Sequence, residues 1–147
     1  MAKNLTSDYS NMGRARADRH TFSVLVVDDE PMMRMMLAVI LSERGCKVLT
    51  AEDGEEALAM ARSGACPEID ILITDLCMPG MSGAALAVEL RAERPGLKTI
   101  FVSGFSEEEI AAMYLDMAQA AFVSKPFQMR TIDEAIRNLT DCVAISR

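Results

Sequence analysis

Histidine is almost absent from this sequence, and its single copy, His20, lies in a polar stretch near the amino-terminal end. Catalysis or metal binding by histidine within a folded core is therefore nearly excluded. No apolar stretch approaches the roughly 20 residues that a membrane span needs. The first residues also lack the apolar region of a secretory signal. We therefore expect no insertion into a membrane.

Cysteine and positive charge are also in short supply. The cysteines are Cys46, Cys66, Cys77 and Cys142. They lie far apart and form no CxxC pair, a pattern typical of reduced thiols in a cytoplasmic protein. Lysine and arginine total 15 against 22 acidic residues, which gives a net charge of −7. This acidic balance disfavours direct binding to nucleic acid.

What remains is the composition of one globular domain. The chain has 147 residues, of which 50% are hydrophobic and 25% charged, enough to bury a core without disulfides or metals. Residues 1–21 are polar and mixed in charge, and we interpret them as a flexible tail. Residues 22–147 are the predicted folded domain.

Short apolar runs alternate with helix signals along this domain. The apolar runs lie at residues 22–27, 46–50, 69–74, 98–102 and 120–124. Helices are predicted to begin near Pro31, Asp53, Ser82, Ser106 and Met129. Five strand–helix units predict an α/β fold with a parallel sheet covered by helices on both faces. A closed eightfold barrel needs about twice this length, so we expect an open, doubly wound sheet.

Polar residues stand at the carboxyl ends of four of these five strands. They are Asp28 and Asp29 after the first strand, Asp75 after the third, Ser103 after the fourth and Lys125 after the fifth. A single aspartate at a strand end is more often a helix cap than a reactive group. In doubly wound sheets, however, the carboxyl ends share one edge, where ligands bind. We therefore expect these five side chains to converge.

Three carboxylates on one edge repel one another unless positive charge compensates them. Lys125 supplies one such charge, and a divalent cation would supply two. A site of oxygen ligands without histidine or thiolate favours a hard metal, Mg²⁺ before Mn²⁺. Such a metal beside a lysine and a carboxylate nucleophile indicates phosphoryl transfer.

Four short motifs, "VVDDEP", "DLCMPGMSG", "VSGF" and "FVSKPF", resemble those of receiver domains in two-component response regulators. The resemblance runs from about Ser23 to Ile145, with the motifs in the family's order. It implies a chemotaxis-regulator-like, flavodoxin-like fold of five strands in the order 2-1-3-4-5 with five helices. It also implies that Asp75 accepts a phosphoryl group from a phosphohistidine donor.

The same resemblance implies the roles of the neighbouring residues. Asp28, Asp29, Asp75 and the backbone carbonyl of Cys77 would bind Mg²⁺. Lys125 would pair with the phosphoryl group, and its bond to Pro126 would be cis. Ser103 would be drawn to the phosphoryl group and the Phe122 ring would then turn inward. This change would alter the face formed by the fourth helix, fifth strand and fifth helix. Read alone, Ser103 is a loop hydroxyl and Phe122 a core residue.

The run "PMMRMM" places four methionines in one helix, across too wide an arc for all of them to face a core. At least one is a core residue. We expect Met33 and Met36 to form a docking patch with Pro126 and Phe127 for the donor protein, because methionine suits an adaptable interface.

The predicted function is that of a stand-alone receiver, because the last predicted helix leaves no room for an output domain before Arg147. Its partners would be a sensor histidine kinase or a histidine phosphotransfer protein, and an unknown protein target. It would catalyse only its own phosphorylation and dephosphorylation. The alternatives are a phosphate sink and an interaction module that works without phosphorylation. A phosphatase of the haloacid dehalogenase type is disfavoured, because its nucleophile follows the first strand.

Overall fold

A five-stranded parallel sheet forms the centre of the molecule. The computed structural model describes residues 22–64, 68–104 and 119–145. The strands are β1 (Ser23–Val27), β2 (Lys47–Ala51), β3 (Ile71–Asp75), β4 (Lys98–Ser103) and β5 (Ala120–Ser124). Their order is β2-β1-β3-β4-β5, and every neighbouring pair is parallel. The predicted doubly wound sheet and its strand order are therefore confirmed.

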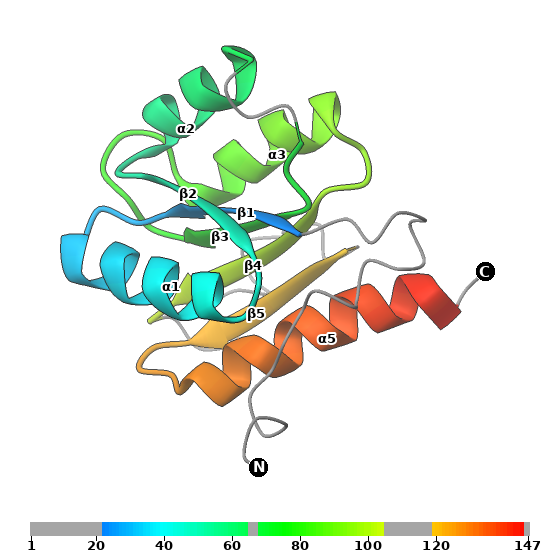
Figure 1. Cartoon of the computed structure of the whole chain (residues 1–147). Helices are drawn as coiled ribbons and strands as arrows, with labels where there is room; N and C mark the ends of the chain where they lie inside the picture. Colours follow the sequence, from blue (N-terminus) through cyan, green and yellow to red (C-terminus); the bar gives the residue numbers. More distant parts are fainter. Residues whose placement is uncertain (1–21, 65–67, 105–118, 146–147) are drawn as a thin grey trace.

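Helices cover both faces of this sheet. They are α1 (Pro31–Glu43), α2 (Gly54–Arg62), α3 (Gly83–Glu93) and α5 (Met129–Ile145). Figure 1 shows α1 and α5 on one face and α2 and α3 on the other. The remaining expected helix, which would begin near Ser106, lies outside the described residues, as does the predicted tail at residues 1–21. Among the described residues, no helix has the length and apolar character to cross a membrane.

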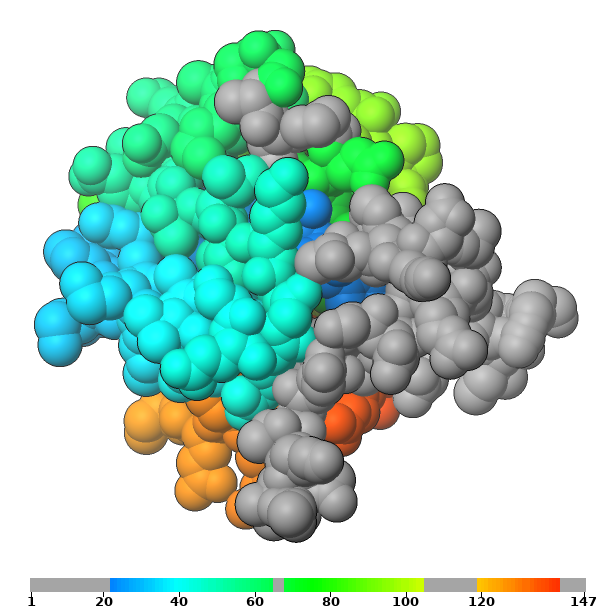
Figure 2. Space-filling model, in the orientation of Figure 1, coloured from blue at the N-terminus to red at the C-terminus, as the bar shows by residue number. Residues whose placement is uncertain are grey.

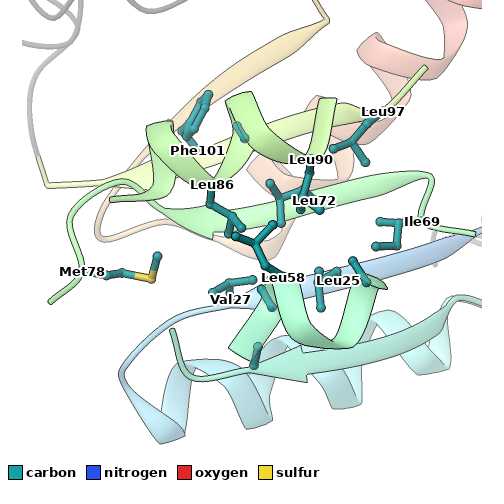
Figure 3. Close-up of a cluster of buried hydrophobic side chains, with 14 of the residues drawn as sticks. Leu25, Val27, Leu58, Ile69, Leu72, Met78, Leu86, Leu90, Leu97 and Phe101 are labelled. Carbon is teal, nitrogen blue, oxygen red and sulfur yellow. The ribbon is translucent and has the colours of Figure 1, made fainter. Parts of the chain in front are cut away.

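Each face of the sheet carries its own apolar core. On the side of α2 and α3, side chains such as Leu25, Leu72 and Leu86 interlock (Figure 3). On the side of α1 and α5, Val26, Ile73 and other side chains pack together. All five residues of β1 are buried, as expected of a continuous apolar run between two helical layers. The sheet is therefore held from both sides, which fixes where its strand ends lie.

Local signals set the beginnings of the helices. Asp53 caps α2, since its side chain accepts a hydrogen bond from the backbone N–H of Glu56 at 2.8 Å. The Glu56 carboxylate bonds to the N–H of Glu52 rather than to that of the cap residue. Ser82 caps α3 in the same way, through the N–H of Ala85. Each cap satisfies an N–H at a helix start, and so anchors the loop that leads into that helix.

An ion pair joins Arg44, the residue that caps the carboxyl end of α1, to Asp133 of α5. The Arg44 guanidinium donates two hydrogen bonds to the carboxylate of Asp133, at 3.0 and 3.1 Å. Both side chains are largely buried, so the pair is poorly screened by water. This contact fixes the carboxyl end of α1 against α5.

Gly83, the first residue of α3, packs directly on the backbone at the end of β3. A Cβ atom at this position would overlap the carbonyl oxygen of Asp75 and approach the backbone of Leu76. The Gly83 N–H also donates to the Leu76 carbonyl at 2.9 Å. Only glycine allows the helix to begin this close to the strand.

We predict that Gly83→Ala lowers the free energy of unfolding by about 1–3 kcal/mol, the usual cost of forcing an extra methyl group into a packed site. Gly96→Ala is the matched control, because a Cβ there would meet open space; its effect should stay within about 0.5 kcal/mol. Urea denaturation followed by circular dichroism measures both. Equal stability of the two variants would contradict this account of Gly83.

Candidate functional site

Four strands are followed or ended by the predicted polar residues: β1, β3, β4 and β5. Their carboxyl ends lie at the same level of the sheet. In the strand register, Val27 pairs with Thr74 and Asp75 pairs with Val102. Ser103 likewise pairs with Ser124. The residues that follow these pairs therefore emerge at one edge. The sheet brings together residues from distant parts of the sequence, as the alternating pattern predicts.

Three carboxylates meet at this edge. Asp28, Asp29 and Asp75 each offer an oxygen atom, and these atoms lie within 4.8 Å of one another. Asp28 is buried, Asp75 is partly buried and Asp29 is exposed. The cluster is therefore anchored in the protein on one side and open to solvent on the other. This arrangement suits a small ligand that must enter and leave.

Lys125 provides the positive charge of the cluster. Its Nζ atom lies 2.9 Å from Asp75 Oδ2 and 3.6 Å from Asp28 Oδ2. Burial alone would lower the pKa of Lys125, but the hydrogen bond to Asp75 and the nearby carboxylates outweigh it and raise the pKa. The ammonium group therefore stays charged, and it ties β5 to β3 and β1. The Lys125–Pro126 peptide bond is cis, as the resemblance implies.

Asp28 is held in position by the backbone around it. The Glu30 N–H donates to Asp28 Oδ1 at 2.9 Å, and the Asp28 N–H donates to the Ala51 carbonyl at 3.2 Å. Burial raises the pKa of Asp28; the Glu30 hydrogen bond and the charge of Lys125 oppose the rise. Glu30 itself occupies the cap position of α1, in extended conformation, and its side chain forms no cap bond.

Asp75 is oriented from two sides. Its Oδ1 atom accepts a hydrogen bond from the Cys77 N–H at 3.1 Å, and its Oδ2 atom faces Lys125. Its backbone carbonyl accepts from the Thr74 hydroxyl at 3.0 Å. The Cys77 side chain is exposed and forms no disulfide. The contact of residue 77 with the acceptor candidate is thus through its backbone.

Ser103 and Phe122 lie on neighbouring strands on the α3 side of the sheet. Ser103 is buried at the end of β4, and its carbonyl accepts the N–H of Lys125 at 2.8 Å. The Phe122 ring stacks on Phe101, with ring centroids 5.1 Å apart and planes inclined by 21°. Phe101 occupies the position two residues before Ser103. Ser103 and Phe101 on β4 and Phe122 on β5 therefore form one row of neighbouring side chains, which links the serine to the aromatic pair.

The predicted docking residues differ in exposure. Met36 has 39% of its surface exposed, whereas Met33 packs partly against the core beneath α1. Pro126 is exposed and Phe127 is partly buried against the same core. Exposed apolar side chains continue along α1 at Met32, Met35 and Val39. In the space-filling view, α1 lies at the molecular surface (Figure 2).

Arg34 is a contact of the site that the sequence did not reveal. This half-buried side chain of α1 donates a hydrogen bond from its guanidinium to the backbone carbonyl of Asp28 at 2.7 Å. The only signal in the sequence is its charge within the methionine run. A hydrogen bond to a backbone carbonyl requires no particular residue type at position 28, so no pattern in the sequence predicts it.

The ligand atoms available here fit a hard cation. Every candidate side-chain ligand in the cluster is a carboxylate, and carboxylate oxygens are what Mg²⁺ and Mn²⁺ prefer. One ammonium group stands against three carboxylates, so the edge retains excess negative charge. A divalent cation would balance this excess.

Comparisons with known proteins agree with this geometry. The chain is 37% identical over 120 residues to the sensor kinase CckA of Brucella abortus, which is 81% of this chain and 12% of that protein. It is 34% identical over 124 residues to the probable transcriptional regulatory protein TcrX of Mycobacterium tuberculosis, 84% of this chain and 52% of that protein. The chain thus spans about half of the second relative and far less of the first.

A solved structure shows the same fold. The response regulator TrrA of Thermotoga maritima, crystallised in complex with Mg²⁺ and BeF, superposes with a TM-score of 0.67 and 35% identity, covering 81% of this chain and 99% of that one. The family model of the response regulator receiver domain matches residues 24–137. With more than half of its length matched and the expected sheet in place, this chain belongs to the response regulator receiver domain family of two-component systems.

Proposed function

We propose that this chain accepts a phosphoryl group onto Asp75 from a phosphohistidine donor, in a reaction that requires Mg²⁺. The observation that carries the proposal is the position of Lys125, whose ammonium group contacts Asp75 and lies close to Asp28, two members of a cluster of three carboxylates. Membership of the receiver family supports the same chemistry. The proposed partner is a sensor histidine kinase or a histidine phosphotransfer protein.

The proposed reaction needs few groups. A carboxylate oxygen of Asp75 forms a bond to phosphorus while the bond from phosphorus to the donor imidazole breaks, and the imidazole leaves with the electron pair. Lys125 pairs with the phosphoryl oxygens. Asp28, Asp29, Asp75 and the Cys77 carbonyl would hold Mg²⁺, which when bound neutralises charge on the transferred group. The chain would act on its own aspartate only, and we propose that it does so in the cytoplasm.

The response to phosphorylation is proposed to run through Ser103. A hydroxyl drawn toward the phosphoryl group would leave space along the row that ends in Phe122, whose ring would then turn inward. The face affected would include β5 and α5; the expected helix beside them lies outside the described residues. Output would follow through a protein target on this face or through onward transfer of the phosphoryl group.

The donor is proposed to dock beside the start of α1. Met36 and Pro126 offer exposed apolar surface next to the strand ends, and Met33 and Phe127 support them from partly buried positions. Methionine side chains adapt to varied partner surfaces. In this arrangement the exposed carboxylate edge and the docking patch face the same partner.

The identity of the acceptor can be tested with Asp75→Asn. Wild-type protein incubated with acetyl phosphate and Mg²⁺ should gain one phosphoryl group by intact mass, and the variant should gain none, because an amide is a poor nucleophile. Asp53→Asn is the control, since asparagine also caps a helix and Asp53 is not one of the clustered carboxylates. Labelling that persists in Asp75→Asn would overturn the assignment.

The need for a metal can be tested by its removal. Dialysis against EDTA should slow labelling by acetyl phosphate at least about a hundredfold, because the metal supplies several kcal/mol of charge stabilisation. Addition of Mg²⁺ or Mn²⁺ should restore the rate. Undiminished labelling of metal-free protein would rule out the proposed requirement.

Docking can be separated from chemistry with Met36→Glu. The donor is a histidine kinase that phosphorylates the wild-type protein. A charge buried at the interface should slow transfer from this kinase about tenfold, an effect within the range seen for substitutions of interface residues. Labelling by acetyl phosphate should be unchanged. Val88→Glu on α3 is the control, because Val88 is an equally apolar, exposed position away from α1. Equal losses with both donors would disprove the docking role.

A further inference from the structure

We propose that Arg34 is a positioning residue for the metal site: its guanidinium holds the backbone of Asp28 so that the Asp28 carboxylate is aimed at the cluster. The inference rests on the proposed function, because it concerns the residues that would bind Mg²⁺. It goes beyond that function because it assigns a role to Arg34, whose side-chain hydrogen bond is to the Asp28 backbone and not to any of the carboxylates that would bind the metal.

The contact is short and direct. The Arg34 guanidinium donates to the Asp28 carbonyl at 2.7 Å, at the short end of the range for hydrogen bonds from a charged donor. Arg34 is half-buried, so this bond is partly shielded from water. It is also the only charged side chain of α1 before Glu43. A cation retained among apolar neighbours needs such a partner.

Three polar groups of Asp28 are held by hydrogen bonds, and its Oδ2 atom faces Lys125 at 3.6 Å. Its N–H donates to Ala51 on β2, and its Oδ1 atom accepts from the N–H of Glu30. Its carbonyl accepts from Arg34. The Arg34 N–H donates in turn to the Glu30 carbonyl at 3.1 Å, which closes the first turn of α1. Residues 28, 30 and 34 therefore form one bonded unit, and loss of the guanidinium frees the carbonyl side of it.

The charge of Arg34 and its positioning role predict opposite effects of its removal on Mg²⁺ affinity, so the proposal can be tested. A guanidinium near a metal site repels a divalent cation, so removing it would tighten Mg²⁺ binding if Coulomb repulsion were its only influence. Removing a positioning contact would weaken binding, because the carboxylate would sample orientations that face away from the metal. The sign of the change separates the two roles.

The test is Arg34→Met, which keeps an unbranched side chain of similar length but removes donor and charge. Isothermal titration calorimetry without any phosphodonor should show Mg²⁺ binding weakened by roughly tenfold, the lower end of the range for contacts that orient metal ligands. Arg34→Lys retains a charged donor and should recover most of the affinity. Raising the Mg²⁺ concentration should recover most of the lost labelling rate, which general misfolding would not allow.

Arg44→Met is the matched control, the same substitution at the residue that caps the carboxyl end of α1. It removes the ion pair with Asp133 and should lower stability, yet leave Mg²⁺ affinity within about twofold of wild type, because neither partner of that pair belongs to the carboxylate cluster. Should Arg34→Met fail to fold, Arg34→Ala takes its place: weaker Mg²⁺ binding than wild type supports positioning, and unchanged or tighter binding contradicts it.

Hydrogen exchange on metal-free protein supplies a second readout. The Glu30 amide, bonded to Asp28 Oδ1, should exchange faster in Arg34→Met than in wild type and no faster in Arg44→Met. Mg²⁺ binding that is unchanged or tighter in a folded Arg34→Met variant would overturn the proposal. A wild-type protein that does not bind Mg²⁺ would instead overturn the proposed function, while the exchange rates would still decide whether Arg34 holds Asp28.

Discussion

The balance of charge around Lys125 is the constraint on which the site depends. Its ammonium group contacts Asp75 and lies close to Asp28, and it holds together carboxylates that would otherwise repel one another. One positive charge does not neutralise three carboxylates. The remaining negative charge, partly open to solvent through Asp29, makes this edge of the sheet receptive to a divalent cation. The same imbalance makes the resting edge sensitive to anything that adds or removes charge.

This balance of charge requires that the strand ends keep fixed positions relative to one another. The register between β1, β3, β4 and β5 brings their carboxyl ends level, and apolar cores on both faces hold the sheet in place. Gly83 adds a further restraint, because α3 begins in contact with the backbone of Asp75. A shift in any of these elements would move a carboxylate by more than the hydrogen bonds of the cluster tolerate. The fold therefore contributes to function because it places the carboxylates and the Lys125 ammonium group accurately.

Much of this arrangement could be predicted from the sequence. Buried parallel strands carry continuous apolar runs, and helix starts carry proline or capping residues, so the sheet and the polar strand ends followed from composition and spacing. Other features could not. The bond from Arg34 to the Asp28 carbonyl and the overlap that requires Gly83 both involve backbone atoms, which every residue possesses. The exposure of individual methionines in α1 was likewise open, because a helix with methionines on several sides shows no single apolar stripe.

Helix α1 connects the two parts of the proposed function. Its outer surface carries Met36, which is proposed to contact the donor, and Arg34 reaches from the same turn to the backbone of Asp28. Thirteen residues of hydrogen-bonded helix make this element stiff, and the ion pair of Arg44 secures its far end to α5. A donor seated on α1 would therefore sit at a fixed distance from the carboxylates. Phosphoryl transfer depends on placing phosphorus within reach of its acceptor, so rigidity of this helix is itself a contribution to the rate.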